Sequence, residues 1–287
     1  MCIRDSAERV LELMSQRFIG NPESQLLTVY HPRRGKKHDK VRAVLICAPI
    51  GQEYIRTHWS LRLLANQLAR KGVHVLRFDY SGVGDSAGSI QQIASLDQWV
   101  SDIELAIDEL KRISGAETVM LLGQRFGAAM AAEVTKSRAD VNSLVCLEPV
   151  IDGSDYLDRL RQMHSQMLDL WVCKMETPDN EQFEEILGSQ FRRTLLKEIE
   201  NSRLDFTSVI QPQLIIETVA NEQEFSHPVD GNQKVIRDDR PSSWDELREL
   251  ETALLRPVMT RTIVKTIDDM FDRLQRFNAL QLQKAGV

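Results

Sequence analysis

Residues 123–127 have the types and the spacing that present a nucleophile in many enzymes. They read Gly-Gln-Arg-Phe-Gly, follow the apolar run 118–122 and lead into a helix-forming run of small residues, 128–134. In such a strand–turn–helix layout the middle residue stands at the top of a sheet, and the glycines let strand and helix approach closely. Here the middle residue is Arg125, whose guanidinium stays protonated and cannot attack a carbonyl. Residues 123–127, called the elbow below, are thus predicted to frame a nucleophilic site without its reacting atom.

A few other side chains could take part in such chemistry. Ser81 and Ser86 lie in the glycine-rich stretch 80–88, and Cys47 lies near the end of an apolar run. Serines in glycine-rich turns usually cap or turn the chain, and a thiol in an apolar strand usually packs as a small core residue. His58, at the entry to the first predicted helix, is expected on the helix surface rather than in a crevice. A relocated nucleophile is therefore the minor alternative.

The chain from about residue 41 to 150 alternates between apolar runs and helical patterns, with strands expected at 41–48, 73–79, 118–122 and 143–147. This alternation predicts an α/β fold, with a mainly parallel sheet and helices on both faces. In such sheets the ligand crevice lies beyond the carboxyl ends of the strands. The residues expected to line it are Gln52, Asp79, Arg125, Glu148 and, further along the chain, Glu222.

The flanking segments complete the predicted architecture. A weak helical pattern spans 7–20 and a strand follows at 25–30, whereas a strand, a short strand and a closing helix are expected at 213–219, 234–236 and 263–274. Helical spacing within 153–205, including 183–195, predicts two or three helices that form a lid over the crevice. The predicted division is an N-terminal segment, 1–24, a first core part, 25–152, the lid, 153–205, and a second core part, 206–287.

Composition limits the kinds of partner. The 287 residues carry a formal net charge of −6, which disfavours nucleic acid as the main partner. No apolar run is long enough to span a membrane, and the N-terminus lacks an export pattern. The four cysteines form no CxxC pair and have no histidine at ligand spacing, so reduced thiols, a cytoplasmic location and no metal are expected. No phosphate-binding loop or dinucleotide fingerprint is present, so no cofactor is expected.

Four features, taken in order, form a larger pattern. They are a strand ending at 49–51, a glycine-rich turn at 78–86, the elbow, and a predicted lid followed by a strand and a closing helix. Together they resemble the α/β-hydrolase superfamily, specifically its serine aminopeptidase-like branch, over about residues 25–280. The resemblance implies an α/β-hydrolase fold. The stretches around 51–54 and 77–88 also look like small bacterial hydrolase-like proteins, some of which belong to exosortase-associated exopolysaccharide and protein-sorting systems.

The resemblance implies a serine, then an Asp or Glu, then a histidine, in that chain order. Arg125 occupies the serine's place, and the histidine is expected at about 238–257, where the sequence contains none. His227, near Glu222, is the only histidine after the lid. A surface position is its default interpretation, and a role in a rearranged site is the alternative. The two absences, at separate places, indicate that the serine chemistry has been lost.

An anion-binding geometry would remain after such a loss. The resemblance implies that the backbone N–H of Phe126 and that of Ile50 or Gly51 converge as in an oxyanion hole. Arg125 would make this place more positive. This interpretation predicts that a small acyl or anionic molecule binds there.

The competing interpretation is that Arg125 pairs with a carboxylate and fills the crevice, because an unpaired buried guanidinium is costly. The expected partners are Asp79, Asp85 or Glu148. Three functions are compatible with these residues. The first is a protein that has lost serine chemistry and binds a small ligand or a partner protein. The second is an active hydrolase of ester, thioester or amide bonds with a rearranged site, and the third is an interaction protein whose crevice is filled by its own side chains.

Overall fold

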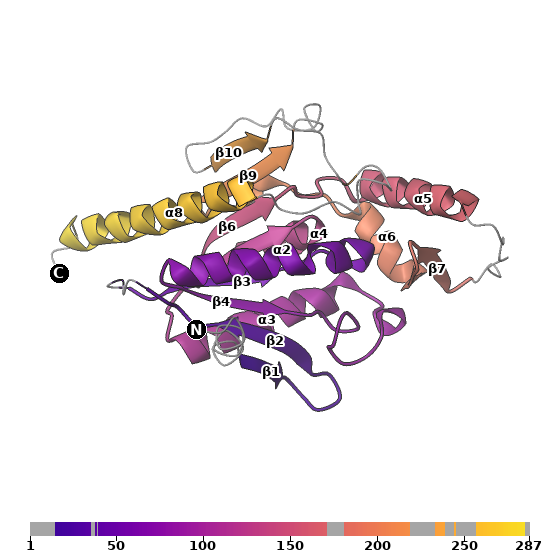
Figure 1. Ribbon diagram of the computed structural model, residues 1–287, viewed down its shortest axis with the longest axis horizontal. Helices are drawn as coiled ribbons and strands as arrows, with labels where there is room; N and C mark the ends of the chain where they lie inside the picture. Colours follow the sequence, from indigo (N-terminus) through magenta and orange to yellow (C-terminus); the bar gives the residue numbers. More distant parts are fainter. Residues whose placement is uncertain are drawn as a thin grey trace, which may run out of the picture.

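The structure, a computed structural model, describes residues 15–35, 38, 40–170, 181–218, 233–238, 244 and 257–284. Its described part contains an eight-stranded sheet in the order β1-β2-β4-β3-β5-β6-β9-β10 (Figure 1). The strands are Ser15–Ile19 (β1), Leu26–His31 (β2), Arg42–Cys47 (β3), Val73–Phe78 (β4), Val119–Gln124 (β5), Val141–Leu147 (β6), Gln213–Thr218 (β9) and Gln233–Asp238 (β10). Along this order every pair of neighbours from β4 to β10 is parallel, whereas β2 pairs antiparallel with both β1 and β4. The predicted α/β sheet is confirmed.

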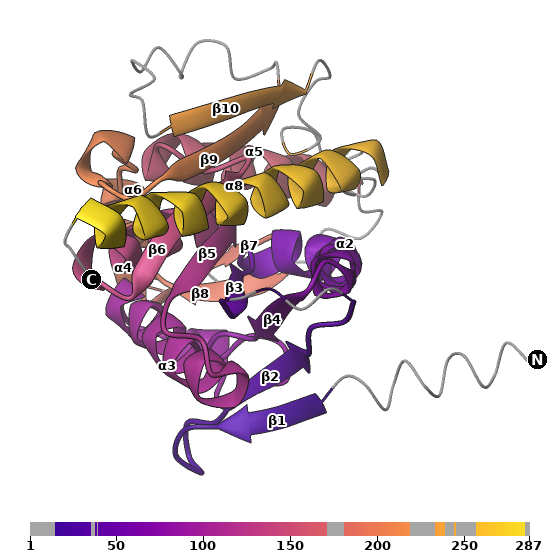
Figure 2. The ribbon, with the colours of Figure 1, turned by 90° about the vertical axis from the view of Figure 1, so that its left-hand side faces the viewer.

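The central strands are apolar on both faces because helices cover both faces of the sheet. In β3, Val44 and Ile46 belong to the core under Gly51–Arg70 (α2) and Pro257–Lys284 (α8), whereas Leu45 and Cys47 belong to the core under Leu96–Ser114 (α3) and Phe126–Ser137 (α4). Figure 2 shows these two pairs of helices on opposite faces of the sheet. A short 3-10 turn at Ile90–Gln92 (η1) precedes α3.

The first strand differs from the weak helical pattern predicted over 7–20. Residues 15–19 form β1, which pairs with β2 from Ser15↔Tyr30 to Ile19↔Leu26. A turn that begins at Gly20, with a φ of 89°, reverses the chain between the two strands. Hydrogen bonding to a neighbouring strand therefore overrides a local pattern that had few apolar residues to bury. Residues 7–14 lie outside the described part.

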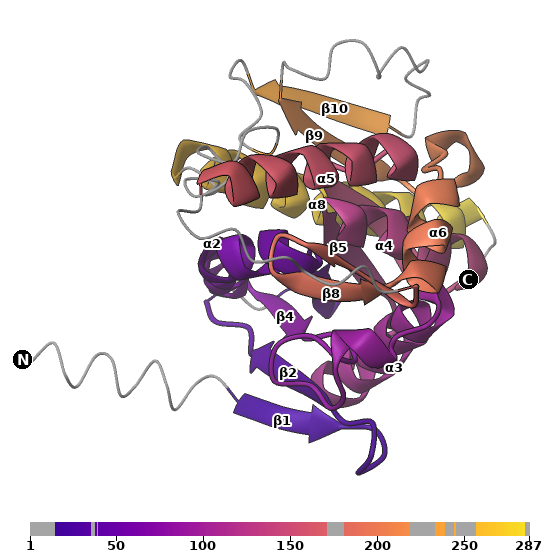
Figure 3. The same ribbon diagram turned by 90° about the vertical axis from the view of Figure 1, so that its right-hand side faces the viewer.

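Residues 153–170 and 181–205 lie over the edge of the sheet toward which the central strands point (Figures 1 and 3). Their elements are Gly153–Leu170 (α5), Phe183–Ile186 (β7), Ser189–Arg192 (β8) and Arg193–Asn201 (α6), and the 3-10 turn Phe206–Ser208 (η2) follows them. The prediction of helices alone was wrong over 183–192, which forms a β-hairpin. Its two loop residues, Leu187 and Gly188, have φ values of 50° and 80°, and a two-residue loop with positive φ matches the twist of a hairpin. Phe183, Ile186 and Phe191 are therefore spaced as in a helix but lie in the two strands of the hairpin.

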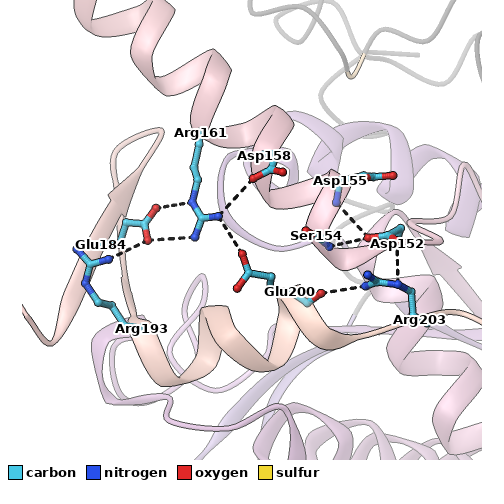
Figure 4. Close-up of polar contacts among 9 residues, drawn as sticks. All are labelled: Asp152, Ser154, Asp155, Asp158, Arg161, Glu184, Arg193, Glu200 and Arg203. Carbon is cyan, nitrogen blue, oxygen red and sulfur yellow. Dashed lines mark hydrogen bonds and ion pairs between the residues drawn. The ribbon is translucent and has the colours of Figure 1, made fainter.

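A polar network joins the elements of this segment (Figure 4). Arg161 on α5 donates to both carboxylate oxygens of Glu184 on β7, at 2.7 and 3.2 Å, and to Glu200 on α6 at 3.3 Å. A two-pronged guanidinium–carboxylate contact fixes geometry as well as charge. Arg203 pairs with Asp152, 2.8 Å away, just before α5. The segment is thus tied together by its own charges as well as by apolar packing.

Candidate functional site

The elbow has the predicted geometry. β5 ends at Gln124, α4 begins at Phe126, and Arg125 between them has a φ of 53° and a ψ of −127°. That conformation is strained for a residue with a Cβ. A Cβ on Gly123 would lie 2.4 Å from Ala128 Cα, and one on Gly127 would lie 2.3 Å from the Ala48 carbonyl oxygen. The two glycines therefore let α4 pass close to β5 and β3.

The side chain of Arg125 is buried and paired. Its Nε lies 3.0 Å from Glu53 Oε1, and the two side chains are 5% and 1% exposed. Its Nη1 donates to the backbone carbonyl of Glu148 at 3.2 Å. Pairing with a carboxylate, the second of the two sequence interpretations, therefore describes this arginine, although the partner is Glu53 and not the carboxylate of Asp79, Asp85 or Glu148.

Glu53 was missed because no helical pattern was recognised in residues 49–54. They instead include the first turn of α2, which begins at Gly51. A carboxylate is favourable in the first turn of a helix because of the helix dipole. An acidic residue three positions after Ile50, close to a predicted strand end, was the available signal in the sequence.

Two aromatic rings complete the enclosure of Arg125. Its Cζ lies 5.9 Å from the ring centroid of Tyr156 on α5 and 5.1 Å from that of Trp244. The Tyr156 hydroxyl donates to Glu53 Oε2 at 3.1 Å, and the Trp244 Nε1 contacts the Glu148 carboxylate. Trp244 lies within the span 238–257 in which a histidine was expected. That span thus contributes an aromatic ring to the elbow.

The charge state of this cluster follows from its surroundings. Burial alone would lower the pKa of the Arg125 guanidinium, but the Glu53 carboxylate, Tyr156 and Glu148 outweigh it, so the pKa lies above its ordinary value. Burial, followed by the charge of Glu53, raises the pKa of Tyr156 well above its ordinary value. Arg125 therefore stays cationic and Tyr156 stays a neutral hydrogen-bond donor.

The positions expected to form an oxyanion hole lie at adjacent strand ends. β3 and β5 are neighbours, paired at Cys47↔Gly123, so α2 and α4 begin close together, after Ile50 and at Phe126. The Phe191 ring from the hairpin lies against Gly51, 3.3 Å from where a Cβ would be. Gln52, in the first turn of α2, is half-buried. The segment 153–205 therefore covers this edge with Phe191 and Tyr156.

Asp79 belongs to a different group of residues. It follows β4, which is separated from β5 by β3. Its carboxylate accepts from the Tyr54 hydroxyl at 2.7 Å and from the Asp85 backbone N–H at 3.1 Å. A Cβ on Gly84 would lie 2.3 Å from Asp79 Oδ2, so the glycine-rich turn wraps closely around this carboxylate. Glu222 and His227 lie outside the described residues.

The alternative nucleophiles, Ser81, Ser86 and Cys47, are engaged in the structure or held as a neutral thiol. The Ser81 hydroxyl donates to Asp102 at 3.0 Å, and the Ser86 hydroxyl donates to the Asp79 carbonyl at 2.6 Å. Burial raises the pKa of the Cys47 thiol to about 12, so it is not a thiolate at neutral pH. Within the described residues no group of His, Cys, Asp and Glu could hold a metal ion, and no described helix could cross a membrane.

The parallel sheet, the elbow and the flanking helices define an α/β-hydrolase fold. The chain belongs to the family described as serine aminopeptidase, S33, which residues 39–225 match. Similar solved structures include a protein from Agrobacterium vitis S4, with 19% identity and a TM-score of 0.59 over 90% of this chain and 98% of that one. Alpha/beta hydrolase domain-containing protein 10 from mouse has 17% identity and a TM-score of 0.58 over 91% and 99%.

Est1E from Butyrivibrio proteoclasticus has 12% identity and a TM-score of 0.57 over 90% of this chain and 98% of that one. No curated protein matches the sequence. At these identities the structural matches establish the fold alone and do not define the chemistry at the elbow.

Proposed function

We propose that this chain does not hydrolyse substrates through a serine and acts by binding, either of a small acyl or anionic molecule or of a partner protein. The observation that carries the proposal is Arg125 at the nucleophile position, held 3.0 Å from Glu53 in a buried ion pair. A guanidinium has no lone pair available for attack, and the expected histidine span contributes Trp244 to the same cluster. A cytoplasmic location, compatible with the free buried thiols of Cys47 and Cys146, is part of this proposal.

The pairing of Arg125 favours binding away from the elbow. An anionic ligand at the elbow would compete with Glu53, whose carboxylate is already paired and buried. Displacing a partner from a buried ion pair leaves a charge without compensation and is strongly unfavourable. The aromatic rings of Tyr156 and Trp244 also occupy the space around the guanidinium. A partner protein, or a small ligand held elsewhere on the fold, is thus favoured over a ligand on Arg125.

Labelling with a fluorophosphonate serine probe tests this proposal. The wild-type protein is expected to remain unlabelled, and so is Arg125→Ser, because a serine at the elbow would still lack a histidine base from residues 238–257. An active serine hydrolase labelled in the same gel is the positive control. Labelling of the wild type that disappears when one serine is replaced would contradict the proposal and locate the nucleophile.

The alternative, an active hydrolase with a rearranged site around His227, predicts a different result. Hydrolysis of p-nitrophenyl esters or thioesters would then be measurable, and His227→Ala would abolish it while the folded state persists. His38→Ala is the matched control, because within the described residues the hydrogen bond of the His38 ring is an exposed one, from Nε2 to the Lys71 carbonyl. Ester turnover that His227→Ala removes and His38→Ala preserves would establish the alternative.

A further inference from the structure

A second group of charged side chains lines a cavity on the α2 face of the sheet. The cavity has a volume of about 270 Å³ and lies between α2 and strands β2 and β4. Its charged lining consists of Arg62, Arg77, Asp79 and Asp85, and His58 lies beside them. The cavity shares no lining residue with the cluster around Arg125, so binding in the cavity does not depend on whether the elbow has lost its serine chemistry.

Arg77 is the unusual member of this lining. It lies in the fully buried strand β4 and is 8% exposed. Its Nε donates to His31 Nε2 at 3.2 Å, and its two terminal nitrogens make no hydrogen bond or ion pair within the described residues. Both nitrogens keep accessible surface, and Arg77 lines the cavity, so they are open to it. A buried guanidinium is normally paired with an anion.

The other charges of the cavity are also unpaired. Within the described residues, the side chains of Arg62 and Asp85 make no ion pair or hydrogen bond, and the Asp79 carboxylate accepts only from the Tyr54 hydroxyl and the Asp85 backbone. By contrast, the buried arginine at the elbow has a carboxylate partner. Two cations and two anions thus share one small cavity without forming ion pairs with one another.

The secondary structure separates the two signs of charge along the cavity. Tyr54, His58 and Arg62 lie four residues apart on one face of α2, in successive helical turns. The turn at Tyr54 contacts Asp79. Asn66, one turn after Arg62, contacts His31, which accepts from Arg77 Nε, so the turn at Arg62 lies toward the Arg77 end of the cavity. Alternate residues of β4 point the same way, so Arg77 and Asp79 face α2 with their Cα atoms roughly 7 Å apart. The carboxylates therefore lie at the sheet edge and the guanidiniums lie deeper.

We propose that this cavity binds a small zwitterion of the α-amino acid class. The carboxylate of the ligand lies on the guanidinium groups of Arg77 and Arg62. Its ammonium group lies on the carboxylates of Asp79 and Asp85, and its side chain lies over the apolar surface of β2. A plain dianion such as phosphate fits less well, because the two carboxylates repel it, and a volume of about 270 Å³ suits a molecule of amino-acid size.

The electrostatics of the surrounding groups agree with this arrangement. Burial is the main cause that lowers the pKa of Arg77 to about 10, and Asp79 opposes it. Burial, followed by the charge of Arg77, lowers the pKa of His58, and Asp79 and Asp85 act in the opposite direction. The charges at both ends of the cavity therefore act on the His58 ring. A ligand carboxylate on Arg77 would supply the counter-charge that this guanidinium lacks.

Saturation-transfer NMR on the intact chain tests the proposal with three probes. L-alanine carries both charges, acetate carries the anion alone, and ethylamine carries the cation alone. L-alanine is expected to bind, and each single-charge probe is expected to bind at least about tenfold more weakly. No transfer to L-alanine at millimolar concentration, or equal binding of acetate, would overturn the assignment.

Variants assign the binding to the cavity. Arg62→Gln and Asp85→Asn change partly or fully exposed side chains, so the fold is expected to persist, and each should raise the Kd for L-alanine by roughly tenfold. Arg70→Gln, on an exposed position of the same helix, is the matched control and should leave the Kd unchanged. If Arg70→Gln weakens binding as much as Arg62→Gln does, or if neither cavity variant weakens it, the binding is elsewhere and the proposal is wrong.

Discussion

Arg125 and Arg77 are two buried arginines toward the carboxyl edge of one sheet, and their surroundings differ. Arg125 is paired with Glu53, lies against two aromatic rings and is covered by α5. Arg77 has a histidine on its Nε and a cavity in front of its remaining nitrogens. Arg125 thus fills the nucleophile position with a paired charge. Arg77 instead presents an unpaired guanidinium charge to the cavity.

The difference shows where a ligand can be accommodated on this fold. A charge that is already compensated has no electrostatic reason to take a ligand, because the ligand must first displace a partner. A charge that is buried without an anion gains most from one. The usual site of a fold therefore does not by itself indicate where a ligand binds, and the charges around each cavity have to be compared.

Replacing Arg125 should produce the largest effect on stability. Arg125→Met leaves the Glu53 carboxylate buried without a cationic partner, with only the Tyr156 hydroxyl on it, and the free energy of unfolding is expected to fall by about 3–5 kcal/mol. Urea denaturation followed by circular dichroism measures it. The double variant Arg125→Met with Glu53→Gln removes both charges and should be more stable than Arg125→Met alone. A loss below about 1 kcal/mol for the single variant would show that the pair is not buried as described.

The tightness of the elbow gives the next largest effect. In Gly127→Ala the new methyl group would lie 2.3 Å from the Ala48 carbonyl oxygen, a backbone atom that cannot move freely, so the free energy of unfolding should fall by about 1–3 kcal/mol or more. Gly115→Ala is the control: its φ is 71°, but nothing lies within 4 Å of the added Cβ. Only backbone strain of about 1 kcal/mol is expected there. Equal losses at the two positions would mean that α4 does not approach β3 closely.

The sequence supported prediction of the frame better than of the contacts. The alternation of apolar runs and helical patterns predicted the sheet, and the Gly-x-X-x-Gly spacing predicted the elbow, because both depend on local periodicity and backbone geometry. The pairing of Arg125 with Glu53 could not be predicted in the same way. The two residues are 72 positions apart, and several carboxylates were available at neighbouring strand ends. The hairpin at 183–192 was missed because positive φ at Leu187 is rare for a residue with a Cβ.

The companion substitution Arg77→Met sharpens the comparison with Arg125→Met. It removes a buried cation that lacks an anionic partner, and a methionine can fill much of the same space, so the free energy of unfolding is expected to stay within about 1 kcal/mol of the wild type. The lost hydrogen bond to His31 Nε2 opposes the gain from removing the charge. Denaturation in urea under the conditions used for Arg125→Met measures the difference. A loss as large as that of Arg125→Met would show that Arg77 has a structural partner and would remove the contrast.

The pH dependence of stability should change least. Both ring nitrogens of His31 are engaged: Nε2 accepts from Arg77 Nε and Nδ1 faces Asn66 Oδ1 at 3.2 Å. Burial, and after it the charge of Arg77, lowers the pKa of His31 to about 4 from an ordinary value of 6.5. The unfolded chain therefore binds a proton first, and the contribution of His31 to stability is complete above pH 6.5 and falls as the pH decreases toward about 4.

In Arg77→Met the second cause of this shift is absent, whereas burial, Arg34 and Arg62 remain. The lower end of the window should therefore move upward by a fraction of a pH unit, and the acid-induced loss of stability should become smaller. Urea denaturation at a series of pH values between about 4 and 7 measures this, with Arg70→Gln as the control for a simple loss of positive charge. An unchanged pH profile in Arg77→Met would mean that the guanidinium does not face His31, and the description of an open, uncompensated charge in the cavity would fail with it.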